Sequence, residues 1–182
     1  MSFATTRSRR PDQPGGVARI APDGTLDFRI DGFVFPHDIL RDPADDSLLV
    51  VETGAGALHW IDGDGRSGAS LRAITRADDR FPDEPNGAER VIHQGRTYVV
   101  LSHRSDEGRI TLWDITDPEE ARFVWRFPAS GGLGLPHAPI LRNVDDTWWL
   151  VWAHTRGTAD ETGTVGLATT PEPTEPPTYV AD

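Results

Sequence analysis

The stretch LPHAPILRNVDDTWWLVWAHT, residues 135–155, decides the fold. A Pro-His pair opens it, an extended segment and a polar turn follow, and a strongly β-prone strand closes it at a histidine. The same order of parts occurs at two earlier places in the chain. The three proline-led starts, 49 and 51 residues apart, are Pro36-His37, Pro85-Asn86 and Pro136-His137. The β-prone strands end at equivalent polar residues, spaced 51 and 51: Glu52, His103 and His154.

Two further strand-like segments follow each of these pairs. The third segments are ALHWID (57–62), RITLWDI (109–115) and TVGLATT (164–170). The fourth segments are SLRAIT (70–75), RFVWRF (122–127) and TYVA (178–181). Four strands in about 40 to 50 residues match the length and strand count of a β-propeller blade. The sequence therefore predicts an all-β fold made of blades, each with four antiparallel strands.

The repeat also sets the predicted domain boundaries. The three blades are predicted at about 33–75, 82–128 and 133–181, after a hairpin over 16–31. We expect residues 1–15 to form a flexible lead-in. About three blades and one hairpin are too few to close a ring, so the prediction is a partial or truncated propeller. The remaining blades would come from a second copy, as a homodimer, or from a longer protein. A β-sandwich with coincidental spacing is the weaker alternative.

Composition limits the classes of partner and chemistry. The 182 residues carry 18 basic and 29 acidic side chains, a net charge of −11, which repels phosphate backbones and anionic lipid. We therefore expect neither nucleic acid nor a membrane surface as a partner. The absence of cysteine excludes disulfides and thiolate metal sites. No segment has the roughly 18 apolar residues of a membrane span, and no secretory signal is recognisable, so the default location is cytoplasmic.

The repeat-equivalent polar residues are the candidate functional site. In a propeller, equivalent residues at the inner strands converge near the axis, and four of the six histidines fall on these six positions. Imidazole and carboxylate groups suit a divalent metal (Ca, Mg or Zn) or acid–base chemistry near neutral pH. The predicted metal ligands are His37, Glu52, His103, His137 and His154. His137 and His154 are the candidate catalytic residues, and Asn86 and Arg104 are candidate ligand-binding residues.

Structural explanations exist for the same residues. A histidine at a blade start can hydrogen-bond the neighbouring blade, and Glu52 can simply end its strand near solvent. Asn86 precedes Gly87, and Asn-Gly is a strong turn signal. Trp148 and Trp149 are adjacent, so they should face opposite sides of a strand, and one of them can line a groove.

Several propeller families share these short motifs. The run from GVARIAPDGTLDFRI through PHDI to LLVVETGAGALHWID resembles NHL-type and streptogramin-lyase-like propellers. PHDI…LLVVET and LPHAPIL resemble arylsulfotransferase-like propellers, a likeness that implies a nucleophilic histidine among His37, His137 and His154. APILRNVDDTWWLVWAHT…TVGLATT is similar to strands of five-bladed glycosidases. That family's early catalytic Asp has no clear counterpart at the three blade starts, which hold His, Asn and His.

Three functions follow from this interpretation. The first is a propeller that binds a small polar ligand, through a divalent metal at an axial His/Asn/Glu ring, and acts as a lyase or transferase. The second is a non-catalytic scaffold whose blade tops bind a protein partner. The third is a glycosidase-like, carbohydrate-active propeller.

Overall fold

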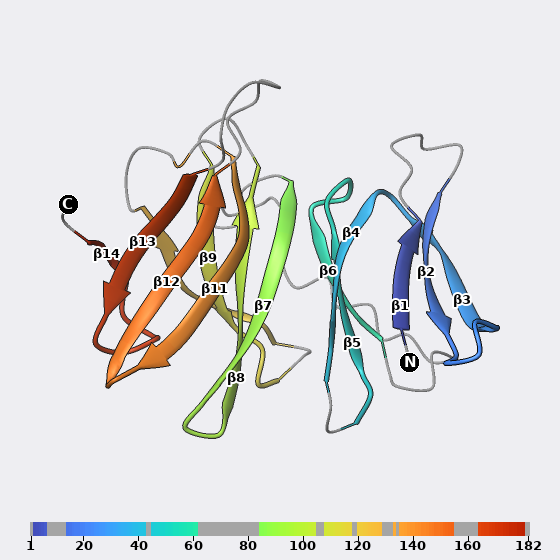
Figure 1. Ribbon diagram of the computed structural model, residues 1–182, viewed down its shortest axis with the longest axis horizontal. Helices are drawn as coiled ribbons and strands as arrows, with labels where there is room; N and C mark the ends of the chain where they lie inside the picture. Colours follow the sequence, from blue (N-terminus) through green and yellow to red (C-terminus); the bar gives the residue numbers. More distant parts are fainter. Residues whose placement is uncertain are drawn as a thin grey trace. The chain divides into compact units, whose positions relative to one another are not determined.

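The computed structural model (Figure 1) has only β-strands as regular structure within its described residues. These residues are 2–6, 14–42, 45–61, 84–104, 108–117, 120–128, 133, 135–154 and 164–180. The strands form antiparallel sheets, and the chain divides into two compact units, Met1–Thr75 and Arg76–Asp182. The all-β class and the partial propeller are therefore confirmed. Within the same residues, no helix has the length and apolar character needed to cross a membrane.

The first unit holds two three-stranded sheets among its described residues. The N-terminal sheet has the order β1-β2-β3 and the first blade the order β4-β5-β6. Their strands are β1 (Ser2–Thr6), β2 (Gly15–Ile20), β3 (Leu26–Phe33), β4 (Pro36–Arg41), β5 (Leu48–Glu52) and β6 (Ala57–Ile61). Where we expected a flexible lead-in, residues 2–6 pair with β2 as an edge strand. The fourth strand predicted at 70–75 lies outside the described residues.

The two sheets of this unit share one apolar core. Strand alternation sends every second side chain of β3 and β5 to the same side. The buried residues of this core are Val17, Phe33, Leu48, Val50 and Ile61, with Phe28, Ile30 and Ile39 packed against them. The N-terminal sheet therefore covers one face of the first blade.

The second unit contains two four-stranded blades in its described part. The second blade has the order β10-β9-β8-β7 and the third blade β11-β12-β13-β14. Their strands are β7 (Pro85–His93), β8 (Arg96–His103), β9 (Arg109–Asp114), β10 (Arg122–Phe127), β11 (Pro136–Val144), β12 (Thr147–His154), β13 (Thr164–Thr170) and β14 (Thr178–Tyr179). Each coincides closely with a strand that the repeat predicted. A tight turn with positive φ at Gln94 (48°) and Gly95 (74°) joins β7 to β8.

The second and third blades pack face to face. The second blade contributes Tyr98, Val100, Ile110 and Leu112 to the shared core, and the third contributes Leu141, Trp148, Leu150 and Trp152. Trp125 belongs to the same core, and its indole N–H donates to the Pro173 carbonyl over 2.8 Å. Trp148 is thus buried between the blades, and Trp149 faces the other way. The prediction that the two adjacent tryptophans separate is confirmed.

Candidate functional site

The first rung of each blade joins the two sets of repeat-equivalent residues. The proline that opens each inner strand pairs with the polar residue that ends the second strand. These pairs are Pro36 with Glu52, Pro85 with His103, and Pro136 with His154. The 51-residue spacing therefore reflects a real structural equivalence in the three ladders.

A β-bulge follows this rung in all three blades. The register shifts between Pro36 and Asp38, between Pro85 and Gly87, and between His137 and Ile140. A bulge leaves one residue out of the ladder and turns its side chain, and bulges are enriched beside active sites. The fold thus leaves His37 and Asn86 out of the ladders of their blades, whereas His137 pairs with Ala153 and the bulge of the third blade omits Ala138 and Pro139.

Asn86 and His137 meet at the start of the two inner strands of the second unit. Asn86 Nδ2 lies 2.8 Å from His137 Nδ1, and Asn86 is completely buried. An amide N–H can donate only to an unprotonated ring nitrogen, so this hydrogen bond requires a neutral imidazole. Burial, together with the positive charge of Arg104, lowers the pKa of His137 below its usual value of 6.5. Geometry and electrostatics therefore agree on neutral His137 at pH 7.

This arrangement predicts a dependence of stability on pH. Because the pKa of His137 is lowered on folding, the unfolded chain binds more protons as the pH falls through about 6.5, and the folded state loses stability there. Above that pH, the stabilising contribution of neutral His137 is fully present. We expect wild-type protein to have a lower urea midpoint at pH 5.5 than at pH 7.5, and His137→Gln to show a smaller difference. An equal difference in both proteins would contradict the assignment.

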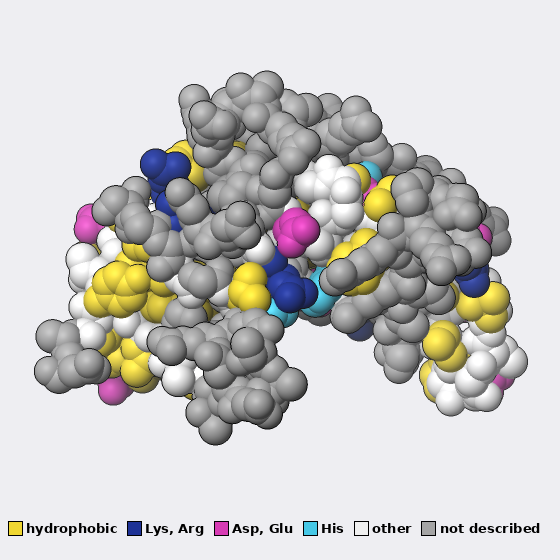
Figure 2. Space-filling model, turned by 90° about the horizontal axis from the view of Figure 1, so that it is seen from above, with side chains coloured by type: hydrophobic (Ala, Val, Ile, Leu, Met, Phe, Trp, Pro, Cys, Tyr) yellow, Lys and Arg dark blue, Asp and Glu magenta, His cyan; other side chains and the backbone are white. Residues whose placement is uncertain are grey.

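Arg104 completes a small polar cluster, which we call the inner-strand cluster: Asn86, Arg104 and His137. Among the described residues, three buried side-chain atoms lack a hydrogen-bond partner, and two of them are Asn86 Oδ1 and Arg104 Nε. The Arg104 backbone N–H donates to the Glu84 carbonyl over 3.0 Å, which fixes the residue just beyond β8. Figure 2 looks along the strands onto the end where β7 and β11 begin, and basic and histidine side chains reach the surface there.

Close packing of the two backbones holds this cluster together. A Cβ on Gly87 would lie 2.9 Å from the Ala138 backbone N and 3.2 Å from Pro139 Cδ. The bulge in β11 brings its backbone toward β7 at this point, and Ala138 has a positive φ of 44°. Asn86-Gly87 is therefore part of a strand rather than a turn, and the glycine is needed for close approach.

Glu89, further along β7, links the same two strands. Its carboxylate accepts the Leu141 backbone N–H over 2.8 Å and pairs with the Arg142 guanidinium. Burial raises the pKa of Glu89, and the hydrogen bond from Leu141 and the charge of Arg142 oppose that rise. Glu89 thus satisfies the open edge of β11.

Glu52 is engaged within the first unit. Its carboxylate is buried, accepts the Val34 backbone N–H and pairs with the His59 ring. Sequence reasoning set His59 aside because it is not repeat-equivalent. The signal was present, since Glu52 is opposite Ala57 across the hairpin and His59 is therefore its diagonal neighbour on the same face.

His103 is also held by its own blade. It is completely buried, and its Nε2 lies 2.8 Å from Thr111 Oγ1. The same hydroxyl oxygen accepts the Trp113 indole N–H over 2.9 Å. His103 thus has a packing role in the second blade.

The predicted metal site is not supported. Within the part of the chain that the structure describes, no group of three or more His, Asp or Glu side chains could hold a metal ion. The structure brings Asn86, Arg104 and His137 together in the second unit, while His37 and Glu52 belong to the first. The His154 side chain lies outside what the structure describes. The metal-binding prediction is therefore corrected.

The sequence matches no protein-family model and no curated protein. By structure, the chain is similar to an endo-1,4-β-xylanase from Bacteroides thetaiotaomicron, with 12% identity, a TM-score of 0.56, and coverage of 99% of this chain and 68% of that chain. An endo-arabinase from the same organism has 14% identity and a TM-score of 0.55, with coverage of 93% of this chain and 72% of that chain. A thermostable family-43 glycoside hydrolase has 10% identity and a TM-score of 0.61, with coverage of 98% of this chain and 68% of that chain.

These neighbours support the predicted propeller fold but not the families that the sequence motifs suggested. The neighbours are glycoside hydrolases, whereas we expected NHL-type, streptogramin-lyase-like or arylsulfotransferase-like propellers. Those resemblances, and the lyase and transferase activities taken from them, were wrong. At 10–14% identity the likeness shows the fold alone.

Proposed function

We propose that the protein binds carbohydrate at the bulged starts of β7 and β11. The inner-strand cluster supplies the polar groups that contact the sugar. The observation that carries this proposal is the pair of buried, unpartnered atoms Asn86 Oδ1 and Arg104 Nε beside His137. A buried acceptor and a buried donor without partners each cost about 1–3 kcal/mol.

A sugar hydroxyl has the donor and acceptor groups that these two atoms lack. One hydroxyl donates one hydrogen bond and accepts up to two, so neighbouring hydroxyls can donate to Asn86 Oδ1 and accept from Arg104 Nε. His137 is neutral, and its Nε2 carries the proton when Nδ1 accepts from Asn86. The cluster therefore offers one acceptor, Asn86 Oδ1, and one donor, Arg104 Nε, without requiring a charged ligand.

The fold supports the same ligand class. The structural neighbours are named as a xylanase, an arabinase and family-43 glycoside hydrolases. A shared fold does not transfer an activity, so the comparison only makes carbohydrate the first class to test.

Binding, rather than hydrolysis, is the chemistry that this cluster suits. Glycoside hydrolysis commonly uses two carboxyl groups about 5–10 Å apart. Glu89, beside the cluster, is committed to the Leu141 N–H and to Arg142. Glu84, whose backbone carbonyl accepts the Arg104 N–H, is exposed just before β7. The blade starts themselves hold His37, Asn86 and His137.

Titration calorimetry with xylohexaose and arabinohexaose tests this proposal. We expect one of them to bind with a Kd on the order of 0.1–1 mM. His137→Gln and Arg104→Gln should each weaken binding at least about tenfold, the worth of a hydrogen bond of about 1.4 kcal/mol. Arg126→Gln changes an exposed arginine on β10 and is the matched control.

Two results would overturn the proposal. One is the absence of binding and of thermal stabilisation by both sugars at about 10 mM, where a millimolar site is mostly filled. The other is binding that both cluster variants leave unchanged.

A further inference from the structure

Arg104 is a partly buried cation without an acidic partner among the residues that the structure describes. Its Nε is buried and has no hydrogen-bond partner. Other arginines, such as Arg19, Arg41 and Arg96, each pair with an aspartate. Taking a charged group out of water costs free energy unless an opposite charge or hydrogen bonds replace the lost hydration. Arg104 is therefore poised to gain from an anion that reaches it.

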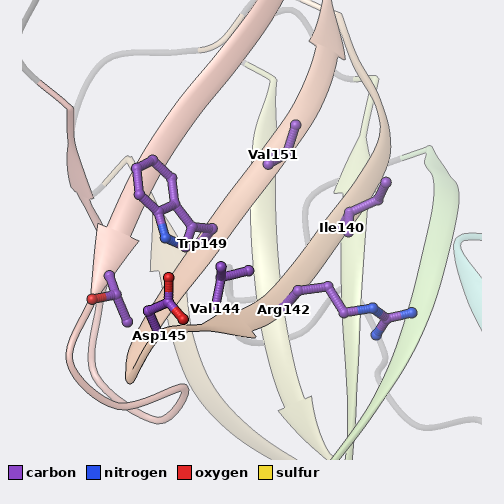
Figure 3. A pocket seen from close by; sticks show the side chains of 7 residues that line it. Ile140, Arg142, Val144, Asp145, Trp149 and Val151 are labelled. Atoms are coloured by element: carbon purple, nitrogen blue, oxygen red, sulfur yellow. The ribbon is translucent and has the colours of Figure 1, made fainter.

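Two glutamates next to the inner-strand cluster do not supply this anion. Glu89 accepts the Leu141 backbone N–H over 2.8 Å and pairs with Arg142. Figure 3 shows Arg142 extending from β11 toward β7, beside a shallow pocket on the outward face of the third blade, the side of its sheet away from the core shared with the second blade. Glu84 holds the Arg104 backbone N–H through its own carbonyl and is exposed. The charge of Arg104 therefore stays uncompensated by either residue.

Arg104 is also the charged member of the cluster at pH 7. Asn86 is an amide, and burial and the charge of Arg104 lower the pKa of His137, so that this ring is neutral. The chain as a whole carries a net charge of −11, which repels anions at long range. At physiological salt that repulsion decays over about 8 Å, so the groups in contact with the ligand decide which charge is accepted.

We propose that the sugar held by the inner-strand cluster is acidic: a uronic acid residue of an oligosaccharide, with its carboxylate on Arg104. This inference rests on the proposed carbohydrate-binding function. A guanidinium binds a carboxylate through two parallel N–H···O hydrogen bonds, and the buried Nε is available as one of the two donors.

A carboxylate alone does not satisfy the cluster. An ionised carboxylate only accepts hydrogen bonds, whereas Asn86 Oδ1 is itself a buried acceptor that needs a donor. The ligand must therefore combine an anionic group with a nearby hydroxyl. A uronic acid has both on one ring, since its hydroxyls can donate to Asn86 while its carboxylate accepts from Arg104. A simple organic acid without a hydroxyl leaves Asn86 Oδ1 unpaired.

Titration calorimetry with matched acids and esters tests the proposal. The probes are xylotetraose with one glucuronic acid branch and trigalacturonic acid, each compared with its methyl ester, which keeps the ring hydroxyls and removes the charge. Wild-type protein should bind at least one acid about tenfold or more tightly than its ester at about 50 mM NaCl. This ratio should decrease at about 0.5 M NaCl, because salt screens a partly exposed ion pair.

Three variants separate the charge of Arg104 from the rest of the protein. Arg104→Gln should bring the ratio of the acid and ester affinities close to one. Arg104→Lys keeps the charge and should retain a preference for the acid, although it loses the Nε donor. Arg126→Gln removes an exposed arginine of β10 and should leave both affinities unchanged. Circular dichroism before each titration checks that the variants are folded.

The outcomes distinguish this inference from the function on which it rests. Binding of a neutral hexaose, with no preference for either acid over its ester, would overturn the inference and leave carbohydrate binding standing. A preference for the acid that Arg104→Gln retains would also overturn it. If neither the neutral hexaoses nor the acids bind at about 10 mM, the proposed function itself fails, and the inference fails with it.

Discussion

Trp152→Ala is expected to lower the free energy of unfolding by about 3–5 kcal/mol, the cost of removing a large aromatic side chain from a core. Trp152 is buried between the second and third blades, and its ring meets Phe127 edge-on at 5.5 Å between centroids. On its other side the indole lies over Gly166, where a Cβ would come within 2.1 Å of the ring. Urea denaturation followed by circular dichroism measures the effect.

Trp149→Ala is the matched control for this prediction. The same change, on the same strand but on the outward face, removes a partly exposed ring and should cost about 1 kcal/mol or less, as for most surface substitutions. Similar losses in the two variants would show that the two tryptophans are not divided between a buried and an open face.

Gly87→Ala is expected to destabilise the protein by about 1–3 kcal/mol, the usual cost of overpacking. The new methyl group would meet the Ala138 backbone N at 2.9 Å and Ser102 Oγ at 3.1 Å. Backbone cannot rotate away as a side chain can, so β7 and β11 must separate. Because Asn86 and His137 stand on these strands, sugar binding should weaken together with stability. Urea denaturation and titration calorimetry measure the two effects.

The direction of this change is informative. At a strand position with room for a Cβ, replacing glycine by alanine stabilises a protein by about 0.4–1 kcal/mol, because the unfolded chain loses freedom. An equal or higher stability of Gly87→Ala would therefore mean that the two inner strands are not in close contact.

The blades of the second unit were predictable because pattern and spacing agree there. Runs such as TYVVL and WWLVW are rich in β-branched and aromatic residues, which favour strands. Polar turns bound them, and the 51-residue interval aligns the strand ends. Local preference and repeat thus indicated the same elements, β7 to β14.

The N-terminal strand β1 was missed for the converse reason. Ser2–Thr6 is short, has no counterpart in the repeat, and is followed by a polar segment. It becomes a strand because the edge of β2 offers unpaired backbone groups. Pairing of this kind depends on the tertiary structure and leaves no periodic signal in the sequence.

The candidate site was predicted in part. Equivalence in the repeat pointed to Asn86 and His137, and the structure places these two in hydrogen-bond contact. The repeat also suggested that Glu52 and His103 face a ligand. Both side chains are instead buried and form hydrogen bonds with residues of the same unit. Spacing locates a residue along the chain, but the bulges and the strand alternation decide which way its side chain points.

The bulged first rung has an evolutionary consequence. His37, Asn86 and the residues just after His137 stand beside the ladder and are not members of it, so exchanging them leaves the regular backbone pairing of the sheet intact. Such positions can vary in chemistry while the remaining rungs preserve the architecture. A propeller of this type is therefore able to acquire a new ligand preference by single substitutions at the tips of its central strands, without redesign of a blade.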